Sequence, residues 1–226
     1  MNIRNYDNDF QTKSNFKQIK PFMPSDTFTM LLCGPRNCGK TNLLMNMLLE
    51  PCIYFDELYV YAKNLHQEKY QDLMKKFEEI ANNNHIKNPT HFSNDKIILV
   101  TQLPTADDLQ RVVIFDDYIC DKNQDDIVNY FIQGRHKNCS VMYLSQSYFK
   151  TPKDVRLNCT HLCIFKLHSK REIDNVLRDH DVLKEAYDVA TSEKHSFLYI
   201  DHERNKLLKK FEELSDQLAG TTFLQE

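Results

Sequence analysis

Short apolar runs and amphipathic stretches alternate along the chain. The run Phe28–Cys33 predicts a buried strand, and the apolar segment Asn42–Glu50 that follows it predicts a helix. Glu57–Tyr61 alternates and is rich in tyrosine and valine, which favours a second strand. His66–Ile80 carries its apolar residues at helical spacing and is typical of an amphipathic surface helix. The chain therefore opens with a strand–helix–strand–helix pattern.

The same pattern continues to the C-terminus. We predict strands over Arg111–Phe115, Cys139–Ser145, His161–Leu167, Ser196–Asp201 and Lys206–Phe211, a short extra strand over Lys96–Thr101, a helical turn over Ala106–Gln110, and helices over Asp125–Gln133, Pro152–Asn158, Lys170–His180 and Val182–Thr191. The asparagine-rich segment 81–94 reads as a loop. Strands that alternate with helices predict an α/β fold, with a mostly parallel central sheet covered by helices on both faces. The last two strands predict a hairpin at the sheet edge.

Length and composition fit one α/β domain. The chain has 226 residues, of which 41% are hydrophobic and 27% charged. We expect a polar N-terminal arm over residues 1–24, the domain over 25–215 and a polar tail over 216–226. The first residues lack the apolar core of a signal peptide and no apolar run is long enough to span a membrane, so we expect a cytosolic-type protein with no membrane partner.

Charge and cysteine content narrow the function classes. The net charge of -3 gives no global basic footprint for nucleic acid, so any DNA contact must come from local loops or from a ring of subunits. The seven cysteines are odd in number and scattered, and no second pair joins Cys159 and Cys163 to complete a zinc site. They are expected to be reduced structural thiols.

One segment carries a phosphate-binding motif. Gly34, Pro35, Arg36, Asn37, Cys38, Gly39, Lys40 and Thr41 fit G-x-x-x-x-G-K-[ST], between the predicted strand and a helix that opens at Asn42. In this context the loop's N–H groups and the helix N-terminus point at anionic oxygens. Lys40 would reach the β- and γ-phosphates of ATP, and Thr41 would bind Mg²⁺. The alternative is a tight strand–helix turn in which the lysine binds no phosphate.

Polar residues at two further strand ends complete a nucleotide site. Asp116 and Asp117 follow the run Val112–Phe115, and Gln146 ends the strand after it. Ligands of parallel sheets lie beyond the carboxyl ends of the strands. Asp116 would complete the Mg²⁺ shell, and Asp117 would orient or deprotonate the attacking water. Gln146 would sense the γ-phosphate through its amide.

Arg135 lies on the other side of its strand. It precedes Cys139–Ser145, so it cannot serve its own site, but it could act on a neighbouring subunit as an arginine finger. Arg156 is the competing candidate, and a surface ion pair is the alternative for Arg135. Lys122, Lys137 and Lys150 lie in loops around the site; each could reach DNA phosphates or be plain surface.

Taken together, GPRNCGKT, IFDDY, GRHKN and LSQSYF resemble the DNA-packaging ATPases of large DNA viruses, virophages and Maverick/Polinton-type elements, within the FtsK/HerA superfamily. The resemblance runs from about Phe28 to the C-terminal hairpin. It implies a strand order in which the Gln146 strand lies between the phosphate-loop strand and the Asp116 strand. The departure is Asp117, where cellular relatives usually have glutamate; the viral branch tolerates aspartate.

The resemblance also implies a biological role. It is that of an ATP-driven motor that pulls double-stranded DNA into a capsid, working as a pentameric or hexameric ring with capsid or procapsid vertex proteins as partners. The implied location is the host cytoplasm or viral factory, or the virion itself. Three other hypotheses use the same residues: a HerA-like cellular translocase or helicase, a small-molecule P-loop kinase, and an inactive ATPase domain that serves as a capsid element.

Overall fold

The computed structural model describes residues 16–50, 52–104, 109–120 and 124–214. The strands are β1 (Thr29–Cys33), β2 (Glu57–Ala62), β3 (Thr90–Ser93), β4 (Arg111–Asp116), β5 (Cys139–Ser145), β6 (His161–Phe165), β7 (Phe197–Asp201), β8 (Lys206–Lys209) and β9 (Glu212–Glu213). The helices are α1 (Lys40–Leu49), α2 (Glu68–Asn83), α3 (Asp125–Gln133), α4 (Lys153–Leu157), α5 (Lys170–Asp179) and α6 (Lys184–Ala190), with 3₁₀ turns η2 (Val100–Gln102) and η3 (Gly134–Lys137).

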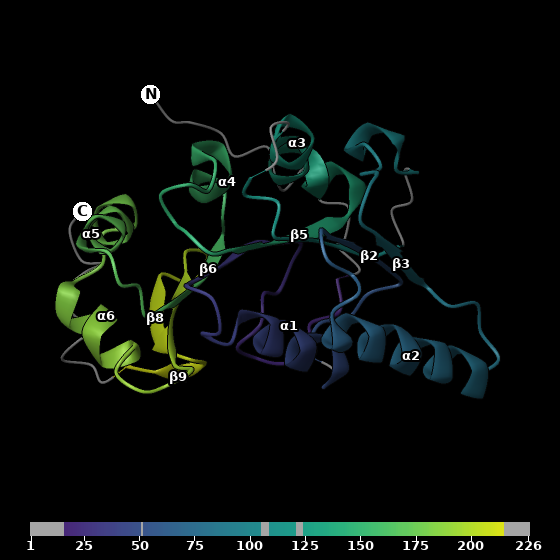
Figure 1. Ribbon diagram of the computed structural model, residues 1–226, viewed down its shortest axis with the longest axis horizontal. Helices are drawn as coiled ribbons and strands as arrows, with labels where there is room; N and C mark the ends of the chain where they lie inside the picture. Colours follow the sequence, from purple (N-terminus) through teal and green to yellow (C-terminus); the bar gives the residue numbers. More distant parts are fainter. Residues whose placement is uncertain (1–15, 51, 105–108, 121–123, 215–226) are drawn as a thin grey trace, which may run out of the picture.

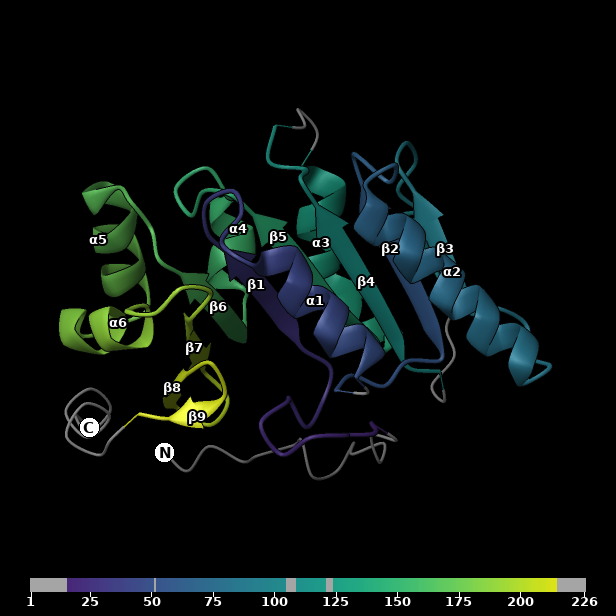
Figure 2. The ribbon, with the colours of Figure 1, turned by 60° about the horizontal axis from the view of Figure 1, so that its bottom comes forward.

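The described strands form one sheet in the order β3-β2-β4-β5-β1-β6-β7-β8-β9. Strands β1 to β6 pair in parallel. Strands β7, β8 and β9 extend the sheet in antiparallel fashion. The predicted α/β fold with a C-terminal edge hairpin is confirmed, and so is the predicted place of β5 between β1 and β4 (Figure 2).

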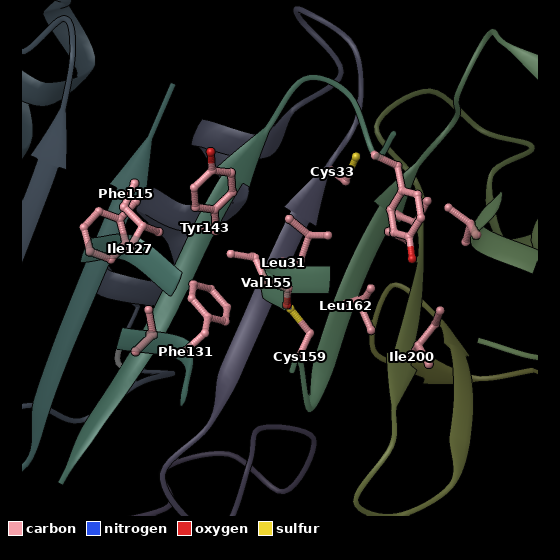
Figure 3. Packing of buried hydrophobic residues seen from close by; sticks show 14 of the residues in the cluster. Leu31, Cys33, Phe115, Ile127, Phe131, Tyr143, Val155, Cys159, Leu162 and Ile200 are labelled. Atoms are coloured by element: carbon pink, nitrogen blue, oxygen red, sulfur yellow. The ribbon is translucent and has the colours of Figure 1, made fainter. Parts of the chain in front are cut away.

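Period-two alternation within the central strands builds a core on each face of the sheet. On β1, Leu31 and Cys33 join the cluster under α3 and α4, whereas Met30 and Leu32 join the cluster under α1 and α2. Figure 1 shows these two helix pairs on opposite faces of the sheet, and Figure 3 shows the first cluster from close by. Because each strand is buried on both faces, the central strands read as continuous apolar runs.

One strand lies where the sequence predicted a loop. The edge strand β3 pairs with β2, and its His91 stacks on Tyr59 with ring centroids 4.7 Å apart. The predicted strand Lys96–Thr101 is wrong: residues 96–99 are irregular and 100–102 form η2. The backbone of Ile98 bonds to tyrosine hydroxyls instead of to a neighbouring strand. Its N–H donates to Tyr61 Oη at 3.2 Å, and its carbonyl accepts from Tyr130 Oη at 2.6 Å.

Other predicted bounds shift by a few residues. Helix α2 runs on into the asparagine-rich segment as far as Asn83, and α1 begins at Lys40 rather than Asn42. Of the predicted N-terminal arm, residues 1–15 lie outside the described residues. So do residues 106–108 of the predicted helical turn, the candidate DNA contact Lys122, and 215–226. The described part of the arm packs on the domain: Met23 is buried, and Arg204 donates to the carbonyls of Pro21 and Met23. The division into arm, domain and tail stays a prediction.

A histidine pair, the buried His180 and the exposed His202, joins β7 and α5 to the segment after β5. His202 lies 3.0 Å from Nδ1 of His180, whose Nε2 lies 2.7 Å from Tyr148 Oη. The Tyr148 hydroxyl donates to Asp179 at 3.1 Å, and Arg156 pairs with the same carboxylate oxygen at 2.6 Å. One hydroxyl proton cannot serve two acceptors, so His180 Nε2–H donates to Tyr148. In a neutral His180, Nδ1 then accepts from His202 Nε2–H. Protonation of His180 Nδ1 would remove that acceptor.

We predict acid-dependent destabilisation from this network. Burial, with the nearby His202, lowers the pKa of His180 to about 4. The unfolded chain then binds this proton first, so the stabilisation is complete above about pH 6.5 and is lost as pH falls toward 4. Urea unfolding should show a loss of as much as about 3 kcal/mol from this group over that range. His180→Gln should flatten the pH dependence.

The exposed His66 supplies the control for this measurement. His66→Gln should follow the wild-type curve. A His180→Gln variant that keeps the full wild-type pH dependence would contradict the assignment.

Candidate nucleotide site

The phosphate loop requires glycine at two positions for different reasons. At Gly34 an added Cβ would lie 2.6 Å from the Cβ of Phe165 and 2.8 Å from the Cys38 sulfur, so no side chain fits there. Gly39 has a φ of 118°, in the left-handed region that favours glycine. The first glycine lets the loop cross close to β6, and the second turns the chain into α1.

The N-terminus of α1 faces the loop with its N–H groups uncapped. Gly39 occupies the N-cap position, and no side chain caps the helix there. The first N–H groups of a helix lack intrahelical acceptors, and the helix dipole adds partial positive charge at this end. Lys40 is buried and its Nζ donates to the carbonyls of Gly34 at 2.6 Å and Pro35 at 3.0 Å. Thr41 is half-buried in the next position. This concentration of donors fits the phosphates of a nucleotide.

Strand pairing brings the other predicted groups to the same edge. Strand β5 pairs with β1 so that Ser145 lies opposite Cys33, and with β4 so that Leu144 lies opposite Asp116. The Gly34 N–H continues the first ladder by donating to the Ser145 carbonyl at 3.1 Å. Figure 2 shows the loops that follow β1 and β5 side by side at this edge. Gln146 and Asp116 therefore lie on one side of the phosphate loop, Gln146 after the adjacent strand and Asp116 on the strand beyond it.

The predicted water-handling pair is in direct contact. The Gln146 amide donates to Asp117 Oδ1 at 3.0 Å, and both side chains are exposed. Asp117 has a positive φ of 63°, so the chain turns sharply as soon as β4 ends. An amide can donate with its nitrogen and accept with its oxygen. The pair presents a carboxylate and an amide oxygen at the mouth of the site.

Asp116 lies deeper and is held by a tyrosine. Burial raises the pKa of the Asp116 carboxyl above its usual range, and the neighbouring Asp117 adds to that shift. A hydrogen bond from the Tyr70 hydroxyl and the charge of Lys40 act in the opposite direction. A cation at this carboxylate would therefore relieve a desolvated charge. Tyr70, Asp116 and Lys40 form one electrostatic unit.

A cavity of about 330 Å³ opens beside the phosphate loop. The loop residues Arg36 and Cys38 line one side, and Phe165, Lys166 and His195 line the other. His195 Nδ1 lies 3.0 Å from the Cys38 carbonyl, which ties the segment before β7 to the loop. This cavity continues the phosphate cradle and offers room for the nucleoside of a nucleotide.

The two candidate finger arginines have different surroundings. Arg135 lies in η3 before β5, with its side chain 79% exposed and 3.7 Å from Asp26. Strand β5 has seven residues. At about 3.3 Å per residue, it separates Arg135 from the Gln146 edge by roughly 20 Å. Arg156 is held within its own subunit, where it pairs with Asp179 and lies 4.7 Å from the Tyr148 ring centroid. Of the two, Arg135 is the one available to a partner.

Sequence reasoning missed two residues at this site. Tyr70 lies inside the predicted amphipathic helix His66–Ile80, whose pattern gives its hydroxyl no role, and the sequence pattern gives none to His195. The signal for Tyr70 was its hydroxyl, because a buried tyrosine among Leu73 and Phe77 usually has a polar partner. Nothing in the local sequence indicates that His195 contacts Cys38, because 157 positions separate them.

The sequence profile of the family described as Poxvirus A32 protein matches residues 14–202. The chain belongs to this family. Membership confirms the predicted resemblance to viral packaging ATPases. No curated protein matches the chain.

Solved structures confirm the fold of this family member. The genome packaging NTPase B204 of Sulfolobus turreted icosahedral virus 2, in complex with AMP, is similar to it with a TM-score of 0.58 and 17% identity, over 82% of this chain and 97% of that chain. The same protein with ATP-gammaS gives 0.57 and 14%, over 80% and 95%. A structure described as B204, the DNA-packaging ATPase from Sulfolobus Turreted Icosahedral Virus, gives 0.57 and 12%, over 82% and 97%.

Two further observations concern the part of the chain that the structure describes. No helix there combines the length and apolar character needed to cross a membrane. No group of three or more His, Cys, Asp or Glu side chains there could hold a metal ion by itself.

Tyr70→Phe tests the electrostatic unit around Asp116. The variant removes the hydroxyl that lowers the pKa of Asp116, so the acidic limb of the ATP turnover profile should move to higher pH. Loss of a hydrogen bond to a charged group should reduce turnover about tenfold on that limb, with recovery at higher pH. Steady-state hydrolysis measured across pH provides the test. Equal loss at every pH would show that the hydroxyl positions Asp116 without controlling its pKa.

Proposed function

We propose that this chain is an ATP-hydrolysing motor that moves double-stranded DNA into a viral capsid. The observation that carries the proposal is the convergence of the phosphate loop, Asp116–Asp117 and Gln146 at one edge of a sheet in a member of the poxvirus A32 family. The related fold of B204, a genome packaging NTPase solved with AMP and ATP-gammaS, supports ATP as the substrate.

Each residue of the site has a role in hydrolysis. Lys40 would turn from the Gly34 and Pro35 carbonyls to the β- and γ-phosphates, while the uncapped N–H groups of α1 bind their oxygens. Thr41 and Asp116 would hold Mg²⁺, which supplies charge neutralisation when bound. Asp117 would accept the proton of the attacking water. Gln146 would hold Asp117 in place and contact the γ-phosphate.

Arg135 would complete the site of the next subunit. It is exposed at the edge of the sheet opposite its own phosphate loop, as a group supplied in trans must be. A planar guanidinium stabilises charge on a phosphoryl group in transfer. We therefore propose a homo-oligomeric ring in which each subunit responds to its neighbour's nucleotide. We also propose that the ring binds capsid vertex proteins and works where virus particles assemble.

Lys40→Ala should lower ATP turnover at least about a hundredfold, because it removes the cation on the transferring phosphoryl group. Initial rates should be measured with and without duplex DNA. Wild type should hydrolyse ATP faster when duplex DNA is present. Equal rates with and without DNA, from a protein that stays monomeric with nucleotide, would exclude the motor.

A mixing experiment tests the shared site. Arg135→Ala alone should lose about a thousandfold in turnover. In an equal mixture with Lys40→Ala, a site with an intact Lys40 can meet a neighbour's intact Arg135, and random assembly restores about a quarter of the sites. Arg156→Ala provides the matched control and should give no such complementation. Absence of rescue from a mixture that does assemble into mixed rings would show that Arg135 does not act in trans.

A further inference from the structure

An exposed aromatic ring and a basic pair meet beside the nucleotide site. Phe149 is 46% exposed, although Tyr148 next to it is buried. The Arg171 guanidinium carbon lies 3.9 Å from the Phe149 ring centroid. Lys150 follows Phe149, Lys170 precedes Arg171, and all three basic side chains are exposed. We refer to Phe149, Lys150, Lys170 and Arg171 as the Phe149 patch.

The charge of this region differs from that of the chain. The net charge of the chain is -3, yet neither 145–153 nor 165–171 contains an aspartate or glutamate. Their basic residues are Lys150, Lys153, Lys166, Lys170 and Arg171. Both segments follow strands that flank β1, so both lie at the carboxyl edge of the sheet. The stack of Arg171 on Phe149 joins the two segments. Glu172, which accepts from Ser147, is an acidic side chain at their junction, and the exposed groups around it are basic.

The helix position of two of these cations is unfavourable for folding. Lys170 and Arg171 are the first two residues of α5. Cations at a helix N-terminus oppose the dipole, and the usual effect is about 0.3–1 kcal/mol each. Positive charge at this place does not serve the stability of the helix. It fits a polyanion that approaches from solvent.

The Phe149 patch is tied mechanically to Gln146. Ser147 donates to Glu172 of α5, and the Lys150 N–H donates to the Ser147 hydroxyl at 3.2 Å. Thr151 closes the loop on its other side through Ser145 Oγ at 2.7 Å and the Ser147 carbonyl at 2.8 Å. The loop is therefore compact and internally bonded. A shift of Gln146 when the γ-phosphate leaves would carry Phe149 and Lys150 with it.

We propose that the Phe149 patch grips the phosphate backbone of duplex DNA and transmits the state of Gln146 to it. This inference rests on the proposed function, for which it names the DNA-contacting residues. Phe149 holds the Arg171 plane in place, while Lys150 and Lys170 add phosphate contacts on either side. The contacts are with backbone only, so binding is independent of DNA sequence.

Fluorescence anisotropy of a labelled duplex, titrated over a range of salt concentrations with ADP present, tests the proposal. Lys150→Ala/Arg171→Ala should bind about tenfold more weakly at low salt, and its slope of log affinity against log salt should be shallower by about 0.9 for each cation lost. Phe149→Leu keeps an apolar side chain but removes the ring, and it should bind about threefold more weakly. A role confined to anchoring α5 would change thermal stability and leave the salt slope unchanged.

Lys75→Ala/Lys76→Ala is the matched control, since these lysines are exposed on α2 at the far end of the sheet from α5 (Figure 1). The control should bind duplex DNA as wild type does. If Lys150→Ala/Arg171→Ala binds like this control, the Phe149 patch does not contact DNA. If its affinity for a fluorescent ATP analogue falls as far as its affinity for DNA, the patch serves the nucleotide, and the inference is wrong.

Failure of the proposed function has a different signature. Wild-type protein would then show neither affinity for the duplex nor DNA-stimulated turnover. Failure of the inference alone leaves wild type bound to DNA and stimulated by it, with the Lys150→Ala/Arg171→Ala variant unchanged in salt slope.

Discussion

The candidate site depends on one constraint, the parallel pairing of β5 with both β1 and β4. Parallel strands end at the same edge, so this register places the groups that follow each strand within reach of one another. Gln146 lies more than 100 positions after the phosphate loop, and Asp116 lies between them in the sequence. Hydrogen bonds between the paired strands nevertheless fix where each group lies along the edge of the sheet. A slip by one residue would exchange the faces of β5 and bury the wrong side chains. Stability and chemistry thus rely on the same pairing.

The segment after β5 is held firmly by hydrogen bonds. Its Tyr148 contacts His180, which in turn contacts His202. Its Ser147 and Thr151 bond within the loop and to α5. Gln146 therefore sits on a rigid support and makes its one described side-chain contact with Asp117. A group that senses hydrolysis transmits more of its displacement through bonded neighbours than through a loose chain. The antiparallel strands take part in this support through His202.

The fold and much of the site could be predicted from sequence because local signals agreed. The continuous apolar runs of β1, β4 and β5 indicate strands that are buried on both faces. The loop motif between β1 and α1 predicts phosphate binding. The failures came from long-range effects. Residues 96–99 have the composition of a strand, but Tyr61 and Tyr130 bind the backbone N–H and carbonyl of Ile98 in place of a neighbouring strand. The polar segment of β3, in contrast, forms a strand because it pairs with β2. The contacts of Tyr70 and His195 arise only when distant segments meet.

The left-handed backbone at Asp117 bears on why an aspartate, rather than a longer acid, suits this position. Short side chains with a carbonyl-type oxygen tolerate that region several-fold more often than longer ones. The main chain thus selects the shorter acid, and the long amide of Gln146 spans the remaining gap from the neighbouring strand. A longer side chain at either position would therefore disturb the contact between the two.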